Sequence, residues 1–185
     1  ALLGDVAAAP PSCPRRHAPV THRAWPPGPA CAGDNLDLIL WRHGEAKDAA
    51  APLADTDREL SSRGLEHAGL AAEWLRRQRL PKVMVLSSPA KRALQTARTL
   101  GLPVKVKTQL GVGASTADLL GAADWPDHPG AIILVSHQPA LGRLAALLLA
   151  GSEADWTIKK AGIWWFSNRV RRDETQTVLR AVYNP

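Results

Sequence analysis

The sequence predicts an α/β fold, a three-layer α/β/α sandwich whose central sheet is largely parallel and carries a hairpin at one edge. Three observations predict it. From residue 36 onward, short apolar runs alternate with segments of helical spacing, which is typical of a parallel sheet covered by helices. The run 131–136 is apolar throughout, as expected for a strand buried on both faces. The chain ends in two strand-like runs, 164–168 and 177–183, which a polar turn separates.

Two strands and two helices are predicted in the first half of this domain. A strand over 36–41 precedes a helix over 61–79, which Ser61 or Ser62 can cap. That helix carries apolar residues at helical spacing, namely Leu65, Ala68, Ala72 and Leu75. A second strand over 83–88 leads into a helix over 89–100, whose first residue is a proline, a favoured residue at a helix start.

The second half continues the same alternation. A short strand is expected over 104–107 and a short helix over 115–121. The apolar strand 131–136 is then followed by a helix over 139–150, which again opens with a proline. The final hairpin is expected to turn within residues 168–175, where polar residues cluster.

Residues 1–34 are predicted to form a disordered or loosely draped extension. Prolines crowd this segment together with alanine, glycine and a few arginines. Because proline fixes φ and removes a backbone donor, neither a helix nor a sheet is sustained there. The folded domain is therefore expected to span residues 35–185.

The composition narrows the functional classes. The chain has 185 residues and a net charge of +6, which suits one domain that binds an anionic substrate or an acidic protein. The basic residues form no long run, so no nucleic-acid partner is expected. No stretch reaches the ~18 apolar residues of a membrane helix, so no membrane association is expected. Cys13 and Cys31 fit no zinc pattern, and a later chain without cysteine favours a cytoplasmic location.

Three predicted strands end in unusual residues. The first runs into Arg42, His43 and Gly44, and the late apolar strand runs into His137. The strand between them ends at a serine pair, and Arg92 follows one turn into the next helix. Because the carboxyl ends of parallel strands lie at one edge of a sheet, two histidines and two arginines should converge on one pocket.

Those side chains suit phosphate chemistry. The planar donor forks of Arg42 and Arg92 match phosphate oxygens, and the following helix N-termini add positive potential. A neutral His43 can attack phosphorus and carry the phosphoryl group, while a protonated His137 holds its oxygens. Gly44 allows the backbone a close approach. This chemistry needs no metal and no cofactor.

Other interpretations remain open at this point. Taken alone, each residue also fits an ordinary loop histidine, a surface ion pair or a solvated helix arginine. The same machinery suits a small phosphomonoester, such as a sugar phosphate or a nucleotide. A non-catalytic phosphate-binding domain is a further alternative. A metallohydrolase using His43 and His137 is the least favoured, because the predicted pocket lacks a third ligand.

Four segments resemble the histidine phosphatase superfamily. Residues 42–46, RHGEA, resemble its RHG signature, and residues 88–96, SPAKRALQT, resemble its SPxxRAxQT segment. Residues 135–142, VSHQPALG, resemble the segment around its second histidine. Residues 58–64, RELSSRG, are similar to its helix start L-[ST]-xx-G. In this order they look most like the SixA branch of bacterial phosphohistidine phosphatases, which implies a phosphoglycerate mutase-like fold over about residues 36–185.

The resemblance implies a role for each matching residue. His43 would be the nucleophile that becomes phosphohistidine. Arg42 and Arg92 would bind the phosphoryl oxygens, and His137 would complete the pocket and stabilise the transferring group. Arg58 matches an arginine near the pocket mouth and is expected to bind substrate there. The implied partner is a protein that carries phosphohistidine, or else a small phosphorylated substrate.

One departure from the family pattern concerns the general acid. Many members carry an acidic residue after the third strand, whereas residues 109–114, QLGVGA, contain no carboxylate. A leaving alkoxide needs a proton far more than an imidazole does, because the pKa of histidine lies near 6.5. The gap therefore favours a phosphoramidate such as phosphohistidine, and the few lid residues there favour a protein-borne one. Glu45 is a possible acid, as is Asp118, although Glu45 also fits a loop cap or an arginine partner. Ser88 either orients the pocket or is an ordinary turn serine before proline.

Overall fold

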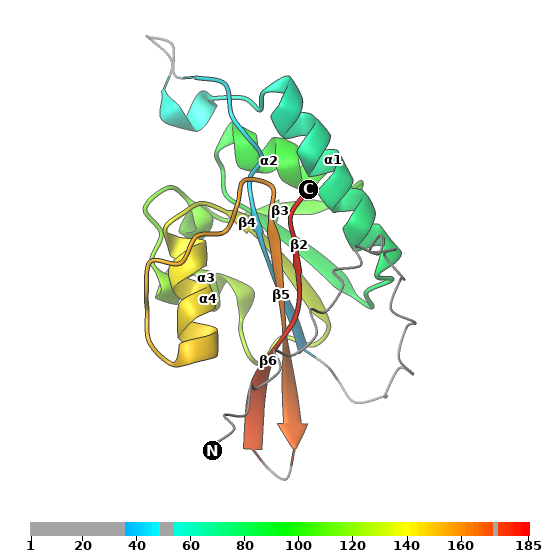
Figure 1. Cartoon of the computed structure of the whole chain (residues 1–185), viewed down its shortest axis with the longest axis vertical. Helices are drawn as coiled ribbons and strands as arrows, with labels where there is room; N and C mark the ends of the chain where they lie inside the picture. Colours follow the sequence, from blue (N-terminus) through cyan, green and yellow to red (C-terminus); the bar gives the residue numbers. More distant parts are fainter. Residues whose placement is uncertain (1–35, 49–53, 172–173) are drawn as a thin grey trace, which may run out of the picture. The chain divides into compact units, whose positions relative to one another are not determined.

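The computed structural model describes residues 36–48, 54–171 and 174–185, in which a six-stranded sheet lies between two layers of helices (Figure 1). The three-layer α/β/α sandwich predicted from the sequence is thereby confirmed. The predicted extension over residues 1–34 lies outside the described residues, so the domain boundary remains a prediction.

The sheet is mixed, with the parallel strands on one side and the hairpin at the edge. Its order is β3-β2-β4-β1-β5-β6. β1 and β4 pair in parallel, as do β2 with β4 and β2 with β3, whereas β5 runs antiparallel to β1 and β6 antiparallel to β5. The strands are β1 (Leu36–Arg42), β2 (Val83–Ser87), β3 (Val104–Val106), β4 (Ala131–Ser136), β5 (Ile163–Arg171) and β6 (Glu174–Tyr183).

The hairpin is longer than its sequence suggests. A turn was expected over residues 168–175, but β5 continues to Arg171 and β6 resumes at Glu174, with these two residues paired. Ladder hydrogen bonds join backbone groups, so polar side chains do not interrupt them. The polar run therefore belongs mostly to the strands, and the prediction of a long turn was wrong.

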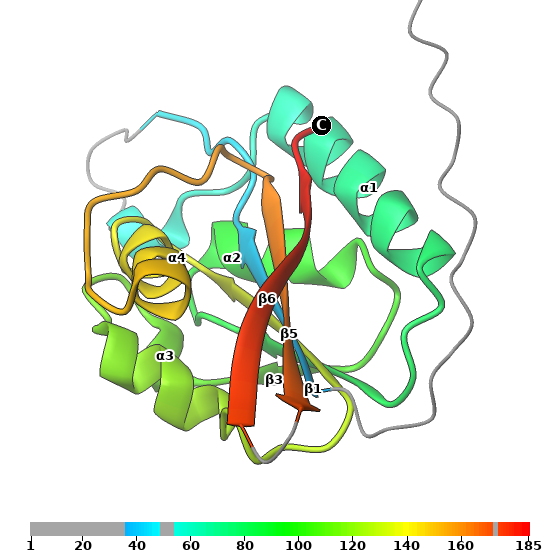
Figure 2. The ribbon, with the colours of Figure 1, turned by 60° about the horizontal axis from the view of Figure 1, so that its bottom comes forward.

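Four helices cover the two faces of the sheet (Figure 2). Ser61 caps α1, because its Oγ accepts a hydrogen bond of 3.0 Å from the Gly64 N–H. Leu65 was expected on the buried stripe of α1 but is 54% exposed, and small alanines make the contact instead. No helix in the described ranges is long and apolar enough to cross a membrane. The helices are α1 (Ser62–Arg77), α2 (Lys91–Arg98), α3 (Thr116–Ala123) and α4 (Ala140–Ala150).

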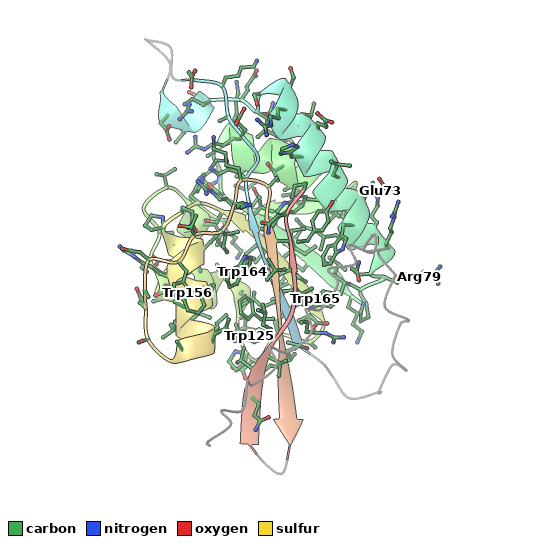
Figure 3. All side chains as sticks on the ribbon, in the orientation of Figure 1. Glu73, Arg79, Trp125, Trp156, Trp164 and Trp165 are labelled. Atoms are coloured by element: carbon green, nitrogen blue, oxygen red, sulfur yellow. The ribbon has the colours of Figure 1, made fainter. Side chains whose placement is uncertain are left out.

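The core lies on both sides of the sheet and holds the strand ends in place. Along β1, Leu38 and Leu40 point to the layer of α3 and α4, while Ile39 and Trp41 point to the layer of α1 and α2. Along β5, Trp164 packs in the layer of α3 and α4, and Trp165 packs in the layer of α1 and α2 (Figure 3). Burial of each such side chain stabilises the fold by about 1.5–3 kcal/mol. The rigid sheet can therefore position functional groups at its carboxyl edge.

Candidate active site

Three strand ends meet side by side at the carboxyl edge of the sheet. In the parallel ladder Arg42 pairs with Ser136, and Ser87 pairs with Val135. The hydrogen bonding continues one residue further, since the His43 N–H donates to the Ser136 carbonyl and the Ser88 N–H donates to the Val135 carbonyl. The residues directly after the strands are therefore fixed by the ladder itself. α2 and α4 begin within a few residues of these ends, as predicted.

His43 and His137 face each other at this edge, with ring centroids 5.0 Å apart. The Nδ1 atom of His43 lies 2.6 Å from the Gly44 carbonyl oxygen, which accepts only from a protonated nitrogen. Nδ1 therefore carries the hydrogen, and Nε2 keeps its lone pair. Burial lowers the pKa of His43 to about 3, so the ring is neutral at physiological pH. His43 has the protonation state that a nucleophile requires.

Arg92 lies beside that lone pair. It is only 5% exposed, and its Nε donates to His43 Nε2 over 3.3 Å. The opposite side of its guanidinium binds Asp55, because Nη2 lies 2.8 Å from a carboxylate oxygen and Nη1 donates to the Asp55 carbonyl. Arg92 is thus anchored at one side and presents Nε to His43 Nε2.

Arg42 lies on the other side of the pocket. Its Nη1 donates to the Ile158 carbonyl over 2.7 Å, while its Nε is buried with no hydrogen-bond partner among the described residues. Both histidines feel its positive charge, which contributes to the lowering of their pKa values. A buried donor without an acceptor is costly. The oxygens of a phosphoryl group are acceptors suited to it.

His137 is held by Ser88. Ser88 Oγ accepts from the Ala90 N–H at 3.2 Å and lies 2.7 Å from His137 Nε2, to which its own hydrogen can be donated. His137 Nδ1 then carries the ring hydrogen, and it is buried without a partner within the described part of the chain. Burial lowers the pKa of His137 to about 4. This ring is therefore neutral at physiological pH, and a protonated His137 beside a phosphoryl group stays a prediction.

Gly44 is required by its own backbone surroundings. A Cβ at this position would lie 2.5 Å from the Gly64 carbonyl oxygen, at the start of α1. Its N–H is already bonded to Thr96 Oγ1, at 3.0 Å. The close approach that this glycine allows is therefore made to α1, and its contact with a substrate stays a prediction.

Arg58 and Glu45 lie outside the group formed by the two histidines and the two arginines described above. Arg58 contacts the Asp55 carboxylate at 2.9 Å and the Lys47 carbonyl at 2.8 Å, so it reaches the pocket only through Asp55. Glu45 accepts from Ser61, and this hydrogen bond lowers its pKa. A carboxylate that is ionised at neutral pH has no proton to donate, so the structure does not support Glu45 as the acid.

Asp118 has a structural role as well. It forms the capping box of α3 with Ser115, whose hydrogen bonds lower its pKa. Asp55 is the functional candidate that sequence reasoning missed. The only signal for it was an aspartate three residues before Arg58, and nothing in the sequence connects that position to Arg92. No three His, Cys, Asp or Glu side chains are grouped as a metal site anywhere in the described residues.

A cavity of about 360 Å³ opens beside Arg42. The loop between α4 and β5 forms one wall of this cavity, and the start of α4 forms another. The side chain of Asp155 is 73% exposed, and it forms an ion pair with Arg143 at the rim of the cavity. The cavity reaches the candidate site at Arg42, and its lining does not include His43, Arg92 or His137. Its lining consists of Arg42, Gln138, Pro139, Asp155, Trp156 and Thr157.

Comparison with known proteins agrees with this geometry. Residues 38–111 match the histidine phosphatase superfamily (branch 1). An uncharacterised protein of Picosynechococcus sp. is 33% identical over 150 residues, which cover 77% of this chain and 91% of that protein. Phosphohistidine phosphatase SixA of Escherichia coli is 32% identical over 126 residues, which cover 63% of this chain and 76% of SixA.

A solved structure leads to the same family. The protein histidine phosphatase SixA complexed with tungstate is similar at a TM-score of 0.66 and 26% identity, over 80% of this chain and 96% of that one. Fold and site together define a phosphatase. The chain belongs to the histidine phosphatase superfamily, which confirms the resemblance seen in its motifs.

Proposed function

We propose that this phosphatase removes the phosphoryl group from phosphohistidine on a signalling or phosphocarrier protein, through a phosphohistidine formed on its own His43. The observation that carries the proposal is the state of His43 Nε2. This atom holds a lone pair, belongs to a neutral ring and lies 3.3 Å from the Nε of Arg92. Neither a metal nor a cofactor enters the proposed reaction.

The reaction has two displacements at phosphorus. In the first, the lone pair of His43 Nε2 forms a bond to phosphorus while the bond to the substrate nitrogen breaks and its electron pair stays with the leaving imidazole. Arg42 and Arg92 donate hydrogen bonds to the phosphoryl oxygens, and His137 Nδ1 supplies a further donor. In the second, a water oxygen forms a bond to phosphorus while the bond from phosphorus to His43 Nε2 breaks. Its electron pair returns to Nε2, both water hydrogens leave with the product as dihydrogen phosphate, and the neutral ring is restored.

The ionised carboxylates support phosphohistidine as the substrate. Hydrogen bonds from Arg58 and then Arg92 lower the pKa of Asp55, and a hydrogen bond from Ser61 lowers that of Glu45. Neither group can protonate a leaving alkoxide at neutral pH, which a sugar phosphate would require. An imidazole leaves without that help when its ring is already protonated. The similarity to Escherichia coli SixA, a phosphohistidine phosphatase, supports the same class.

The test is a dephosphorylation assay with a phosphohistidine carrier protein, run with EDTA present. We expect the wild type to remove the phosphate and His43→Ala to be slower by roughly 10⁴-fold or more. His67→Ala, on α1, is the control and should keep wild-type activity. A label trapped on the wild-type enzyme should be stable in alkali and lost in acid, as an N–P bond is.

Other results would contradict the proposal in different ways. Turnover of small phosphoesters at rates far above the carrier protein would show a small-molecule phosphatase. Binding of phosphate without turnover of any substrate would show a silent binding domain. Full loss of activity in EDTA would show a metal-dependent hydrolase.

A further inference from the structure

Asp55 connects Arg58 to Arg92. Its carboxylate accepts from Arg92 Nη2 at 2.8 Å through one oxygen and from Arg58 Nη1 at 2.9 Å through the other. Its carbonyl accepts from Arg92 Nη1. The chain of contacts therefore runs from Arg58 through Asp55 and Arg92 to His43 Nε2.

Asp55 also lies between the buried pocket and solvent. Its side chain is 52% exposed, whereas the Arg92 side chain that it contacts is 6% exposed. Each carboxylate oxygen has a second lone pair beyond the one used by an arginine. In phosphoryl transfer the leaving atom departs opposite the nucleophile, here away from the half-buried His43 and toward the side from which a protein-borne substrate enters. Asp55 can therefore contact the leaving group of the substrate.

The leaving ring of phosphohistidine has a defined requirement. If the ring nitrogen that is not bound to phosphorus carries a proton, the breaking P–N bond releases a neutral imidazole. Without that proton the ring would leave as an imidazolate anion, which is far less stable. A carboxylate that accepts a hydrogen bond from this N–H favours the protonated, positively charged ring. A phosphate ester has no such group for the carboxylate to bind.

We propose that Asp55 determines substrate specificity by binding the protonated ring of a substrate phosphohistidine, so that the site favours cleavage of a P–N bond over a P–O bond. This inference rests on the proposed function and adds the residue that selects the leaving group. The carboxylate also holds Arg92 in place. The two roles can be separated, because binding the protonated ring requires the negative charge, whereas an uncharged acceptor can still hold Arg92.

The charges around Asp55 are consistent with this role. Arg58 faces it from its own segment and Arg92 from α2, while His137 after β4 and His43 after β1 are neutral in the free pocket. The two arginines keep the carboxylate ionised, because their hydrogen bonds lower its pKa. Asp55 is thus anionic throughout the range in which a histidine ring titrates.

The experiment compares Asp55→Asn with wild type on two substrates. Asn keeps the size and one acceptor for Arg92 but removes the charge. The substrates are a phosphohistidine carrier protein and p-nitrophenyl phosphate, whose phenolate leaves as an anion. Asp55 and Asp57 lie on one short 3-10 helix, Asp55–Asp57, and Asp57→Asn is the matched control. Each rate is measured from about pH 5.5 to about pH 8, with spontaneous hydrolysis subtracted.

We expect Asp55→Asn to lower kcat/KM for the carrier protein about tenfold at pH 8, the effect of a shift of about one unit in the pKa of the bound ring. The loss should shrink toward pH 5.5, where solvent protonates the ring without help. Activity on p-nitrophenyl phosphate should stay equal or rise, because the negative charge no longer repels the phenolate. Asp57→Asn should match wild type on both substrates.

The outcomes separate this inference from the proposed function. An equal loss on both substrates at every pH would show that Asp55 only positions Arg92, and it would overturn the inference while the proposed function stands. Unchanged activity on both substrates would overturn it as well. A wild type that hydrolyses the ester and not the carrier protein would refute the proposed function, and the inference with it.

Discussion

Mild acid should destabilise this protein through His43 and His137. An unfolded chain protonates its histidines near pH 6.5, whereas burial lowers the pKa of His43 to about 3 and that of His137 to about 4 in the folded state. Between these limits the unfolded state binds more protons than the folded state. The free energy of unfolding therefore rises with pH in this window, and it falls as the pH drops below about 6.5.

The magnitude follows from linkage. Each histidine that stays neutral in the folded state costs about 1.4 kcal/mol of stability per pH unit below 6.5. At pH 5 the loss is about 2 kcal/mol for each of the two histidines. Because pH 5 lies above both folded pKa values, neither ring is charged in the folded state and the two losses add to about 4 kcal/mol. That is a large part of a typical stability of about 5–15 kcal/mol.

Urea unfolding between about pH 7.5 and about pH 5 measures this loss. His43→Gln and His137→Gln should each lose about 2 kcal/mol less than wild type over that range, whatever their stability at neutral pH. His67→Gln is the control for removing a histidine outside the pocket. The carboxylates with lowered pKa values titrate below this window and do not contribute to it. An identical pH dependence in wild type and both pocket variants would refute the reasoning.

Three further substitutions test the contacts around the pocket and the packing of α1. Gly44→Ala places a Cβ 2.5 Å from the Gly64 carbonyl oxygen and should destabilise the fold by about 1–3 kcal/mol in thermal unfolding. Gly69→Ala on α1 meets no atom within 4 Å and should stabilise by about 0.5–1 kcal/mol, and the reverse order would contradict this packing. Ser88→Ala removes the partner of His137 Nε2 and should lower kcat about tenfold on the carrier protein with an unchanged far-UV spectrum, whereas unchanged kcat would leave Ser88 a turn residue.

The fold was predictable because strong local patterns and the topology agree. The apolar strand 131–136 is buried at every position, and its register with β1 brings Arg42 beside Ser136. Two details were not predictable. Leu65 fits the helical spacing of α1 but projects beyond the packed stripe, where Ala71 and Ala72 pack against the sheet. The polar residues near Arg171 are typical of a turn, although their backbone continues the antiparallel pairing of β5 with β6.

The candidate site was likewise predictable only in part. Residues at strand ends could be predicted to converge, because parallel topology alone brings His43, Arg92 and His137 to one edge. Asp55 could not be predicted, since it lies on a short 3-10 helix between strand and helix and meets Arg92 across 37 residues of sequence. The packing of Gly44 against α1 could not be predicted for a related reason. Its glycine is required by contact with α1, which only the packed structure reveals.

The pocket also decides which histidine receives a proton when an anion binds. His43 Nε2 already accepts a hydrogen bond from Arg92 Nε. If Nε2 were protonated, its N–H would face the N–H of Arg92 and the hydrogen bond would be lost. His137 Nε2 contacts a hydroxyl, which can rotate from donor to acceptor, so this ring can gain a proton without losing its partner. A phosphoryl group that raises both pKa values would therefore protonate His137 first. The resulting His137 cation would add to the charge of the arginines, while His43 would keep the lone pair that the proposed reaction requires.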